Sequence, residues 1–267
     1  MTRYPVRTIA VDDITLAYSE LGSGYPVLFI NGFASTMDMW NPPVLENLAG
    51  HFRVIIFDNR GTGFSSGSAK EFSIPLLAAD AAGLMDALGI SSAHLVGFSM
   101  GASIAQELAL AVPDRISRLV LVAGECGGSE AVMMQPEIQA MLMDKRGSGA
   151  EIANRMFSLL FPPSWLAGHD PLRYCPEIRE TTSEETAARQ AAALFGWKGS
   201  FSRLAGIGSP TLVITGTEDT VVPAINSHII SKRIPRAERI EIPGAGHGLM
   251  YQVPDQFSSL VLDFLKG

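Results

Sequence analysis

The chain has few of the residues that would build a disulfide scaffold or a basic binding surface. Its 267 residues include two cysteines, Cys126 and Cys175, which give neither a disulfide framework nor metal-ligand spacing. We expect two reduced thiols, with a single bridge as the alternative. Charged residues make up 18% of the chain, and the net charge of −7 comes without any basic run. This balance argues against nucleic acid or an anionic membrane as the main partner.

Long apolar runs are also missing. No apolar run reaches the roughly 18 residues that a membrane span needs, and Met1–Arg7 lacks the apolar core of a signal peptide. The five histidines form no His-Glu-x-x-His pattern and no cluster with cysteine, so we expect no metal. These absences predict a soluble, cytoplasmic protein, and the sequence leaves open whether it forms a homo-oligomer.

Apolar sequence is abundant, at 47% of the residues, and much of it is arranged as unbroken short runs. Such runs are typical of parallel strands buried on both faces. They are Val27–Ile30, Val54–Phe57, Leu95–Phe98 and Leu119–Val122, and two further strands are expected at Thr211–Thr215 and Arg239–Ile242. Helical patterns alternate with them, near Trp40–Leu48, Pro75–Leu88, Met100–Ala111, Ala224–Arg233 and Pro254–Leu265. A hairpin of Thr8–Val11 and Ile14–Tyr18 is expected before the first of these strands.

The alternation stops between residues 125 and 202. That segment has no run typical of a buried strand, is dense in methionine, and is expected to consist of helices and loops. The sequence therefore predicts an α/β fold with a doubly wound, mostly parallel sheet. Residues 1–124 and 203–267 would form its core, and residues 125–202 would be a helical insertion.

The pentapeptide Gly97-Phe98-Ser99-Met100-Gly101 joins a predicted buried strand to a predicted helix. This Gly-x-Ser-x-Gly pattern at a strand-to-helix turn is the setting in which a serine hydroxyl is exposed as a nucleophile. The two glycines allow a sharp turn and a close approach of the helix. Because a serine nucleophile also needs a base, a residue that orients the base and an oxyanion hole, these should follow other strands of the same sheet.

Polar and glycine-rich segments follow four other predicted strands, at the carboxyl edge where open α/β sheets bind ligands. They are Asn31–Ala34, Asp58–Ser65, Gly216–Pro223 and Pro243–Gly248. Together with Ser99, the motifs Asp58-x-Arg60-Gly61-x-Gly63-x-Ser65, Gly216-x-x-Asp219-x-x-x-Pro223 and Gly244-x-Gly246-His247 resemble the α/β-hydrolase fold superfamily. The resemblance covers nearly all of the chain outside the insertion. It implies a serine hydrolase without a cofactor, in which residues 125–202 form a cap over the active site.

The resemblance assigns three catalytic roles. Ser99 would attack a carbonyl, His247 would carry the proton, and Asp219 would orient the His247 ring. Two other carboxylates compete with Asp219: its neighbour Glu218, and Glu125, which follows the strand after the nucleophile helix. Arg60, in the Asp58–Ser65 loop, is expected to brace neighbouring loops rather than to bind substrate.

The oxyanion hole would use the backbone N–H groups of Phe33 and Met100. Many relatives have His-Gly where this chain has Asn31-Gly32, so another group must do whatever that histidine does to hold the loop. Apolar side chains would form the substrate-binding wall, and we assign it to Phe33, Met100, Met133, Met141, Trp165 and Trp197. Two alternatives stay open: the methionines could pack the cap on itself, or a cap arginine could hold an acid, the candidates being Arg146, Arg155, Arg173, Arg179 and Arg189.

Three functions are compatible with these residues. The first is hydrolysis of a carboxylic ester, lactone or related acyl bond in a mainly apolar small molecule, with water as the second substrate. The second is carbon–carbon bond hydrolysis of a diketone-like substrate by the same triad. The third is a slow-turnover ligand receptor on the same scaffold. A serine nucleophile excludes reactions that begin with attack by an aspartate at this turn.

Overall fold

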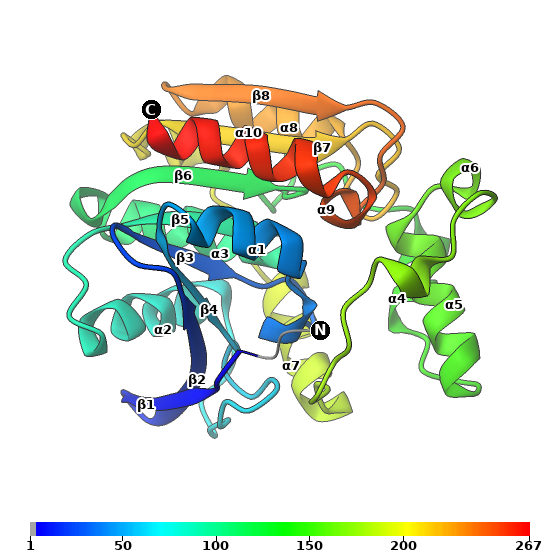
Figure 1. Cartoon of the computed structure of the whole chain (residues 1–267), viewed down its shortest axis with the longest axis horizontal. Helices are drawn as coiled ribbons and strands as arrows, with labels where there is room; N and C mark the ends of the chain where they lie inside the picture. The colour runs from blue at the N-terminus through cyan, green and yellow to red at the C-terminus, as the bar shows by residue number, and fades with distance from the viewer. Residues whose placement is uncertain (1–3) are drawn as a thin grey trace.

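The computed structural model describes residues 4–267, and one eight-stranded sheet organises them (Figure 1). Residues 1–3, part of the Met1–Arg7 segment in which no signal peptide is expected, lie outside the described residues. The strands are β1 (Arg7–Val11), β2 (Ile14–Leu21), β3 (Pro26–Ile30), β4 (Arg53–Phe57), β5 (Ala93–Phe98), β6 (Ile116–Val122), β7 (Thr211–Gly216) and β8 (Ala237–Ile242).

The strand order is β1-β2-β4-β3-β5-β6-β7-β8. The β1–β2 and β2–β4 pairs are antiparallel, and every other pair in the order is parallel. After β3 the chain goes to one side to form β4 and then to the other side to form β5. The neighbours β3 and β5 therefore mark a switch point, where loops diverge and leave room for a ligand. The expected doubly wound, mostly parallel sheet is confirmed.

Helices cover both faces of the sheet (Figure 1). On one face, α1 (Pro42–Ala49) packs against α10 (Pro254–Lys266), which follows the short α9 (Leu249–Gln252). On the other face lie α2 (Ile74–Ala87), α3 (Met100–Ala111) and α8 (Ile225–Arg233). Successive side chains of β3 alternate between the faces: Val27 and Phe29 join one apolar cluster, and Leu28 and Ile30 join the other. Burial on both faces explains the unbroken apolar runs.

The segment between β6 and β7, residues 123–210, is called here the helical insertion. It contains α4 (Pro136–Met143), α5 (Gly149–Leu160), α6 (Pro163–Leu166) and α7 (Glu184–Phe195). Ser148 and Ser183 accept hydrogen bonds from the first turns of α5 and α7, which explains where these helices begin. Figure 1 shows α4, α5 and α6 beyond the arrowheads of the strands, so the helical insertion lies at the edge where the polar loops emerge.

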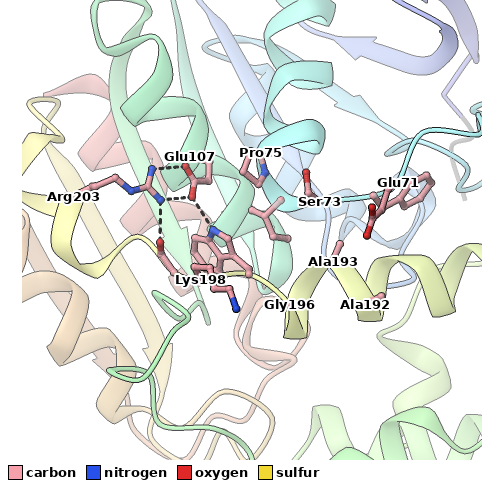
Figure 2. Close-up of a pocket in the computed structure, with 13 residues that line it drawn as sticks. Glu71, Ser73, Pro75, Glu107, Ala192, Ala193, Gly196, Lys198 and Arg203 are labelled. Carbon is pink, nitrogen blue, oxygen red and sulfur yellow. Dashed lines mark hydrogen bonds and ion pairs between the residues drawn. The ribbon is translucent and has the colours of Figure 1, made fainter.

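The helical insertion leaves and rejoins the core at one place, called here the neck. The N–H of Ser200 donates to the carbonyl of Cys126 at 2.8 Å. Beside it, the carboxylate of Glu107 on α3 accepts from Trp197 Nε1 at 2.7 Å and from Arg203 Nη1 at 2.7 Å. Figure 2 shows Arg203 and Glu107 facing each other at the side of an open pocket. These bonds close the neck, so the sheet continues from β6 to β7 without a break.

Arg60 braces the loop between β4 and α2. Its side chain is fully buried, and Nε and Nη2 donate to the two carboxylate oxygens of Asp80 on α2 at 2.8 and 2.6 Å. Nη1 donates to Asp13 in the β1–β2 turn at 2.9 Å. A two-pronged buried pair of this kind fixes the direction of both partners. Arg60 therefore joins β4, α2 and the N-terminal hairpin.

Cys126 is buried and Cys175 is half-buried, and both are free thiols. In the described part of the chain, no helix is both long and apolar enough to cross a membrane. Residues 4–267 also contain no group of three or more His, Cys, Asp and Glu side chains that could hold a metal ion.

Candidate active site

Ser99 lies at the sharp turn between β5 and α3. Its backbone has φ 55° and ψ −121°, a left-handed conformation that side-chain-bearing residues rarely adopt. The N–H of Ser99 donates to the carbonyl of Val122 at 2.9 Å, so the turn is tied to the end of β6. The residue is half-buried. A strained backbone that the surrounding structure holds in place is common at functional sites.

The two glycines of the pentapeptide allow this turn by leaving room for backbone. A Cβ on Gly97 would lie 2.4 Å from the carbonyl oxygen of Gly101. A Cβ on Gly101 would lie 2.0 Å from the carbonyl oxygen of Ile30, the last residue of β3. Both distances are far below van der Waals contact, so α3 can approach β3 and β5 this closely only with glycine at both positions.

His247 and Asp219 form a buried pair at the ends of β8 and β7. Nδ1 of His247 lies 2.8 Å from Oδ2 of Asp219. The other carboxylate oxygen, Oδ1, accepts from the N–H groups of Val221 and Val222 at 2.9 and 2.8 Å. The Asp219 side chain is completely buried, and that of His247 is 6% exposed. These bonds aim the carboxylate at the ring, and they leave Nε2 as the nitrogen for proton transfer.

Of the three carboxylates considered from the sequence, Asp219 is the one that contacts His247. Glu218 is exposed, although it is the adjacent residue. Glu125 follows β6, where its carbonyl oxygen accepts from the Gln106 side chain at 2.9 Å. Burial raises the pKa of the Glu125 carboxyl, which favours the neutral acid. The geometry therefore favours Asp219 as the residue that orients the ring.

Ser99 and His247 line the same cavity, which has a volume of about 500 Å³. Asn31, Gly32 and Phe33 from the loop after β3 line it as well. The opposite wall comes from the helical insertion and is mainly apolar: Leu142, Ile152, Met156, Leu159, Leu160 and Ile178. Three charged side chains, Lys145, Glu180 and Glu184, also line the cavity. The nucleophile and the base thus face an enclosed space suited to a small, mostly apolar molecule.

The expected oxyanion-hole donors lie on the two sides of Ser99. Met100 is the first residue of α3, where a backbone N–H has no partner within the helix. Phe33 follows Gly32, and a Cβ built on Gly32 would lie 3.2 Å from the Cβ of Ser99. Across residues 4–267, no loop or side-chain acceptor takes the N–H of Phe33 or of Met100. Both groups are therefore available to a substrate oxygen.

The structure separates the side chains expected to form the substrate wall. Phe33 lines the cavity, while Met100 is buried beneath the turn. The other four lie elsewhere in the helical insertion: Met133 is exposed, Met141 packs near Val221 and Val222, Trp165 stacks on Phe161, and Trp197 binds Glu107 at the neck. Of the six, Phe33 is the one among the residues that line the cavity. A composition rich in methionine and tryptophan does not indicate which face of each helix meets the sheet.

Sequence reasoning missed most of the wall that the helical insertion does provide. Ile152, Met156 and Leu159 on α5 line the cavity at spacings of four and three residues. That spacing places the three side chains on one face of the helix, so the sequence contains a pattern from which this part of the wall can be predicted. The five arginines considered as acid ligands are absent from the cavity lining; Arg179, for example, binds Asp38. Lys145 is the basic residue that lines it.

Known proteins resemble this chain over nearly its whole length. The model of the "Alpha/beta hydrolase family" matches residues 27–260. The protein named "Putative carbamate hydrolase RutD" from Azorhizobium caulinodans is 30% identical over 256 residues, which cover 94% of this chain and 95% of that protein. "Putative non-heme bromoperoxidase BpoC" from Mycobacterium tuberculosis is 30% identical over 270 residues, with coverages of 94% and 97%.

Among solved structures, the enol-lactonase from Burkholderia xenovorans LB400 superimposes with a TM-score of 0.84 at 26% identity, covering 98% of this chain and all of that one (100%). The family match spans both the nucleophile turn and the loop of His247. The likeness extends over the helical insertion as well as the sheet, because the coverage is nearly complete. The chain therefore belongs to the alpha/beta hydrolase family.

Proposed function

We propose that this hydrolase cleaves a carboxylic ester, a lactone or a related acyl bond through a triad of Ser99, His247 and Asp219. The observation that carries the proposal is the buried 2.8 Å contact of His247 with Asp219, on a ring that lines the same cavity as Ser99. A nucleophile, a base and an orienting carboxylate are the three parts that acyl transfer to serine requires.

The first half of the reaction follows from these positions. Nε2 of His247 takes the proton of the Ser99 hydroxyl as Oγ attacks the acyl carbon. Asp219 keeps the proton on Nδ1 and stabilises the imidazolium that forms. The N–H groups of Phe33 and Met100 donate to the oxygen on which negative charge develops. The imidazolium then gives its proton to the leaving oxygen or nitrogen, and an acyl group remains on Ser99.

The second half repeats these roles with water. His247 removes a proton from a water molecule that attacks the acyl carbon, and Ser99 leaves with the proton returned by the same ring. The apolar side-chain wall of Ile152, Met156 and Leu159 offers water no hydrogen bonds on that side of the cavity, and N–H contacts to an oxyanion are stronger where fewer waters compete for it. The same wall favours an apolar acyl or alcohol group. A carbamate hydrolase and an enol-lactonase among the relatives support an acyl substrate.

Replacing the nucleophile tests the proposal. We expect Ser99→Ala to lower kcat on chromogenic esters by roughly 10⁴-fold or more, because the covalent step is lost. It should also abolish labelling by a fluorophosphonate, which bonds to an activated serine. The measurement is steady-state hydrolysis of 4-nitrophenyl esters of increasing chain length, with a lactone, an aryl carbamate and a vinylogous diketone in the same panel.

Ser103→Ala is the matched control. Ser103 lies one turn further along α3 and is buried, and its Oγ has no hydrogen-bond partner among the described residues. We expect this variant to keep wild-type activity. Turnover or labelling that survives in Ser99→Ala would contradict the assignment. Turnover of the diketone alone would instead indicate carbon–carbon bond hydrolysis by the same residues.

A further inference from the structure

The loop from Asn31 to Asp38 carries the Phe33 N–H and is held by two different parts of the molecule. The core binds its two ends. Asn59 Nδ2 donates to the carbonyl of Asn31 at 3.2 Å, and Asp58 Oδ1 accepts from the N–H of Met37 at 2.7 Å. Between these points lies Ala34, the residue after Phe33, whose φ of 52° is unfavourable for a residue with a side chain. A backbone strained in this way persists only where surrounding groups fix it.

The groups that fix Ala34 come from the helical insertion. Gln190 on α7 reaches the loop with a fully buried side chain, and its Oε1 accepts from the N–H of Ala34 at 2.8 Å. Thr182, two residues before α7, donates its hydroxyl to the carbonyl of Ala34 at 3.0 Å. Both polar groups of this one residue are therefore bound by the helical insertion. In Figure 1, α7 lies apart from α4 and α5, next to the core.

The buried amide of Gln190 is not fully satisfied. Its Nε2 is buried and has no hydrogen-bond partner among the described residues. A buried donor without a partner lowers the stability of the folded protein, so we expect Gln190 to have a role that offsets this loss. Turning the amide over would place Nε2 against the N–H of Ala34, where two donors would face each other. The contact with Ala34 therefore decides which way the amide points.

A third contact ties the helical insertion to the same loop. The carboxylate of Asp38 accepts from Arg179 Nε at 2.9 Å and from the backbone N–H of Arg179, also at 2.9 Å. Arg179 and Asp38 are mostly buried, so this contact is more than a surface ion pair. From Ala34 to Asp38, the loop is thus attached to residues 179–190.

We propose that Gln190 and Thr182 are positioning residues for the oxyanion hole, so that the helical insertion sets the rate of the reaction as well as the shape of the cavity. They hold the two peptide units on either side of the Ala34 Cα, and this fixes the direction of the adjoining Gly32–Phe33 peptide, which carries the Phe33 N–H. This inference rests on the proposed function, because it needs Phe33 to bind the developing oxyanion.

The test removes each contact and follows transition-state binding separately from substrate binding. Thr182 also lines the cavity, and valine keeps its shape there. In Gln190→Leu and Thr182→Val we therefore expect kcat on 4-nitrophenyl butyrate, and the rate of fluorophosphonate labelling of Ser99, to fall about tenfold, with KM changed less than twofold. A donor aimed away from the oxyanion weakens the transition state far more than the bound substrate. The inhibition constant of phenylboronic acid, which forms a tetrahedral adduct on the serine, should rise by a similar factor.

Two further variants separate positioning from mere stability. Thr182→Ser keeps the hydroxyl, so we expect it to restore most of the kcat that Thr182→Val loses. Ser183→Ala removes the side chain that accepts from the Thr186 N–H at the start of α7, and it leaves both Ala34 contacts in place. It should lower the melting temperature while kcat stays close to wild type.

The outcomes are distinct. Wild-type kcat in both Gln190→Leu and Thr182→Val would overturn the inference, and so would a loss of kcat in Ser183→Ala equal to theirs. If Gln190→Leu does not fold, the Thr182→Val and Thr182→Ser pair decides alone, since Thr182 is only half-buried. If wild-type Ser99 is neither labelled nor required for turnover, the proposed function fails first, and the inference fails with it.

Discussion

At Asp219 a single carboxylate is shared between two backbone N–H groups and one imidazole. The backbone N–H groups of Val221 and Val222 fix Oδ1, which leaves Oδ2 for His247. These donors lie two and three residues further along the chain, so this local turn presents the carboxylate to the ring. Such a site can be recognised from sequence, because its Gly-x-x-Asp-x-x-x-Pro spacing reflects the turn itself.

Replacing the Asp219 carboxylate with an amide should lower kcat far more than the same replacement at Glu125. In Asp219→Asn the amide oxygen keeps the bonds from the Val221 and Val222 N–H groups, so the NH2 group faces Nδ1 and the His247 ring loses the acceptor that fixes its tautomer. We expect kcat to fall about 10⁴-fold, by analogy with the serine-protease triad. Glu125→Gln should change kcat less than about threefold, because no contact joins it to the ring. Steady-state kinetics on the two variants decides between them, and a larger loss in Glu125→Gln would reverse the assignment.

Gln190 shows the opposite case, a residue that the sequence does not reveal. Its partner, Ala34, is 156 residues away. Nothing in the local pattern around Gln190 distinguishes it from the other polar residues of α7, because the contact exists only once the helical insertion has docked on the core. Ser99, Asp219 and His247 carry glycine or proline neighbours that mark their turns, and Gln190 carries none.

At the scale of elements, the sequence predicts the strands of the core and helices within residues 125–202, but it does not predict which face of each insertion helix meets the sheet. The strands β3 and β4 and the helix α3 follow from unbroken apolar runs, a glycine-rich turn and a proline after the helix end. The insertion helices have helical patterns too, but each can turn either face towards the sheet. That choice depends on long-range packing, which is why Trp197 was expected at the cavity and lies at the neck instead.

The contact of α3 with β3 should tolerate no side chain at Gly101. In Gly101→Ala the new Cβ would meet the carbonyl oxygen of Ile30 at 2.0 Å, so helix or strand must move. We expect the free energy of unfolding to fall by roughly 3 kcal/mol or more, measured by urea denaturation. Gly149→Ala is the control: a Cβ there meets nothing within 4 Å in the first turn of α5, and stability should be unchanged or slightly higher. Equal stability in the two variants would contradict the expectation.

For the molecule as a whole, one buried histidine links folding to pH. His94 on β5 lies between the rings of Tyr25 and Phe52, at centroid distances of 4.7 and 5.7 Å. Burial, with a smaller contribution from the charge of Arg118, lowers the pKa of His94 to about 4. The unfolded chain binds this proton near pH 6.5. The histidine therefore gives stability that is fully present above pH 6.5 and is lost as the pH falls towards 4.

This linkage predicts that the unfolding free energy of the wild type depends more steeply on pH than that of His94→Leu. Between pH 7 and pH 5 the wild type should lose about 2 kcal/mol more unfolding free energy than His94→Leu does. Urea denaturation of both proteins at several pH values measures the difference, and subtracting the two curves removes the contribution of every other titrating group that they share. Parallel curves for the two proteins would show that His94 is protonated in the folded state as readily as in the unfolded chain.

Because the helical insertion leaves and rejoins the core at a single hydrogen-bonded neck, it resembles a cassette that recombination could exchange. Two crossovers, one at Cys126 and one at Ser200, would exchange the segment between them and keep the sheet, the nucleophile turn and the Asp219–His247 pair. The exchanged piece would, however, include Gln190 and Thr182, which hold the Ala34 peptide. An insertion taken from another protein must therefore supply its own hydrogen-bond partners for Ala34. Exchange of this one segment would then change the substrate range and the catalytic rate together.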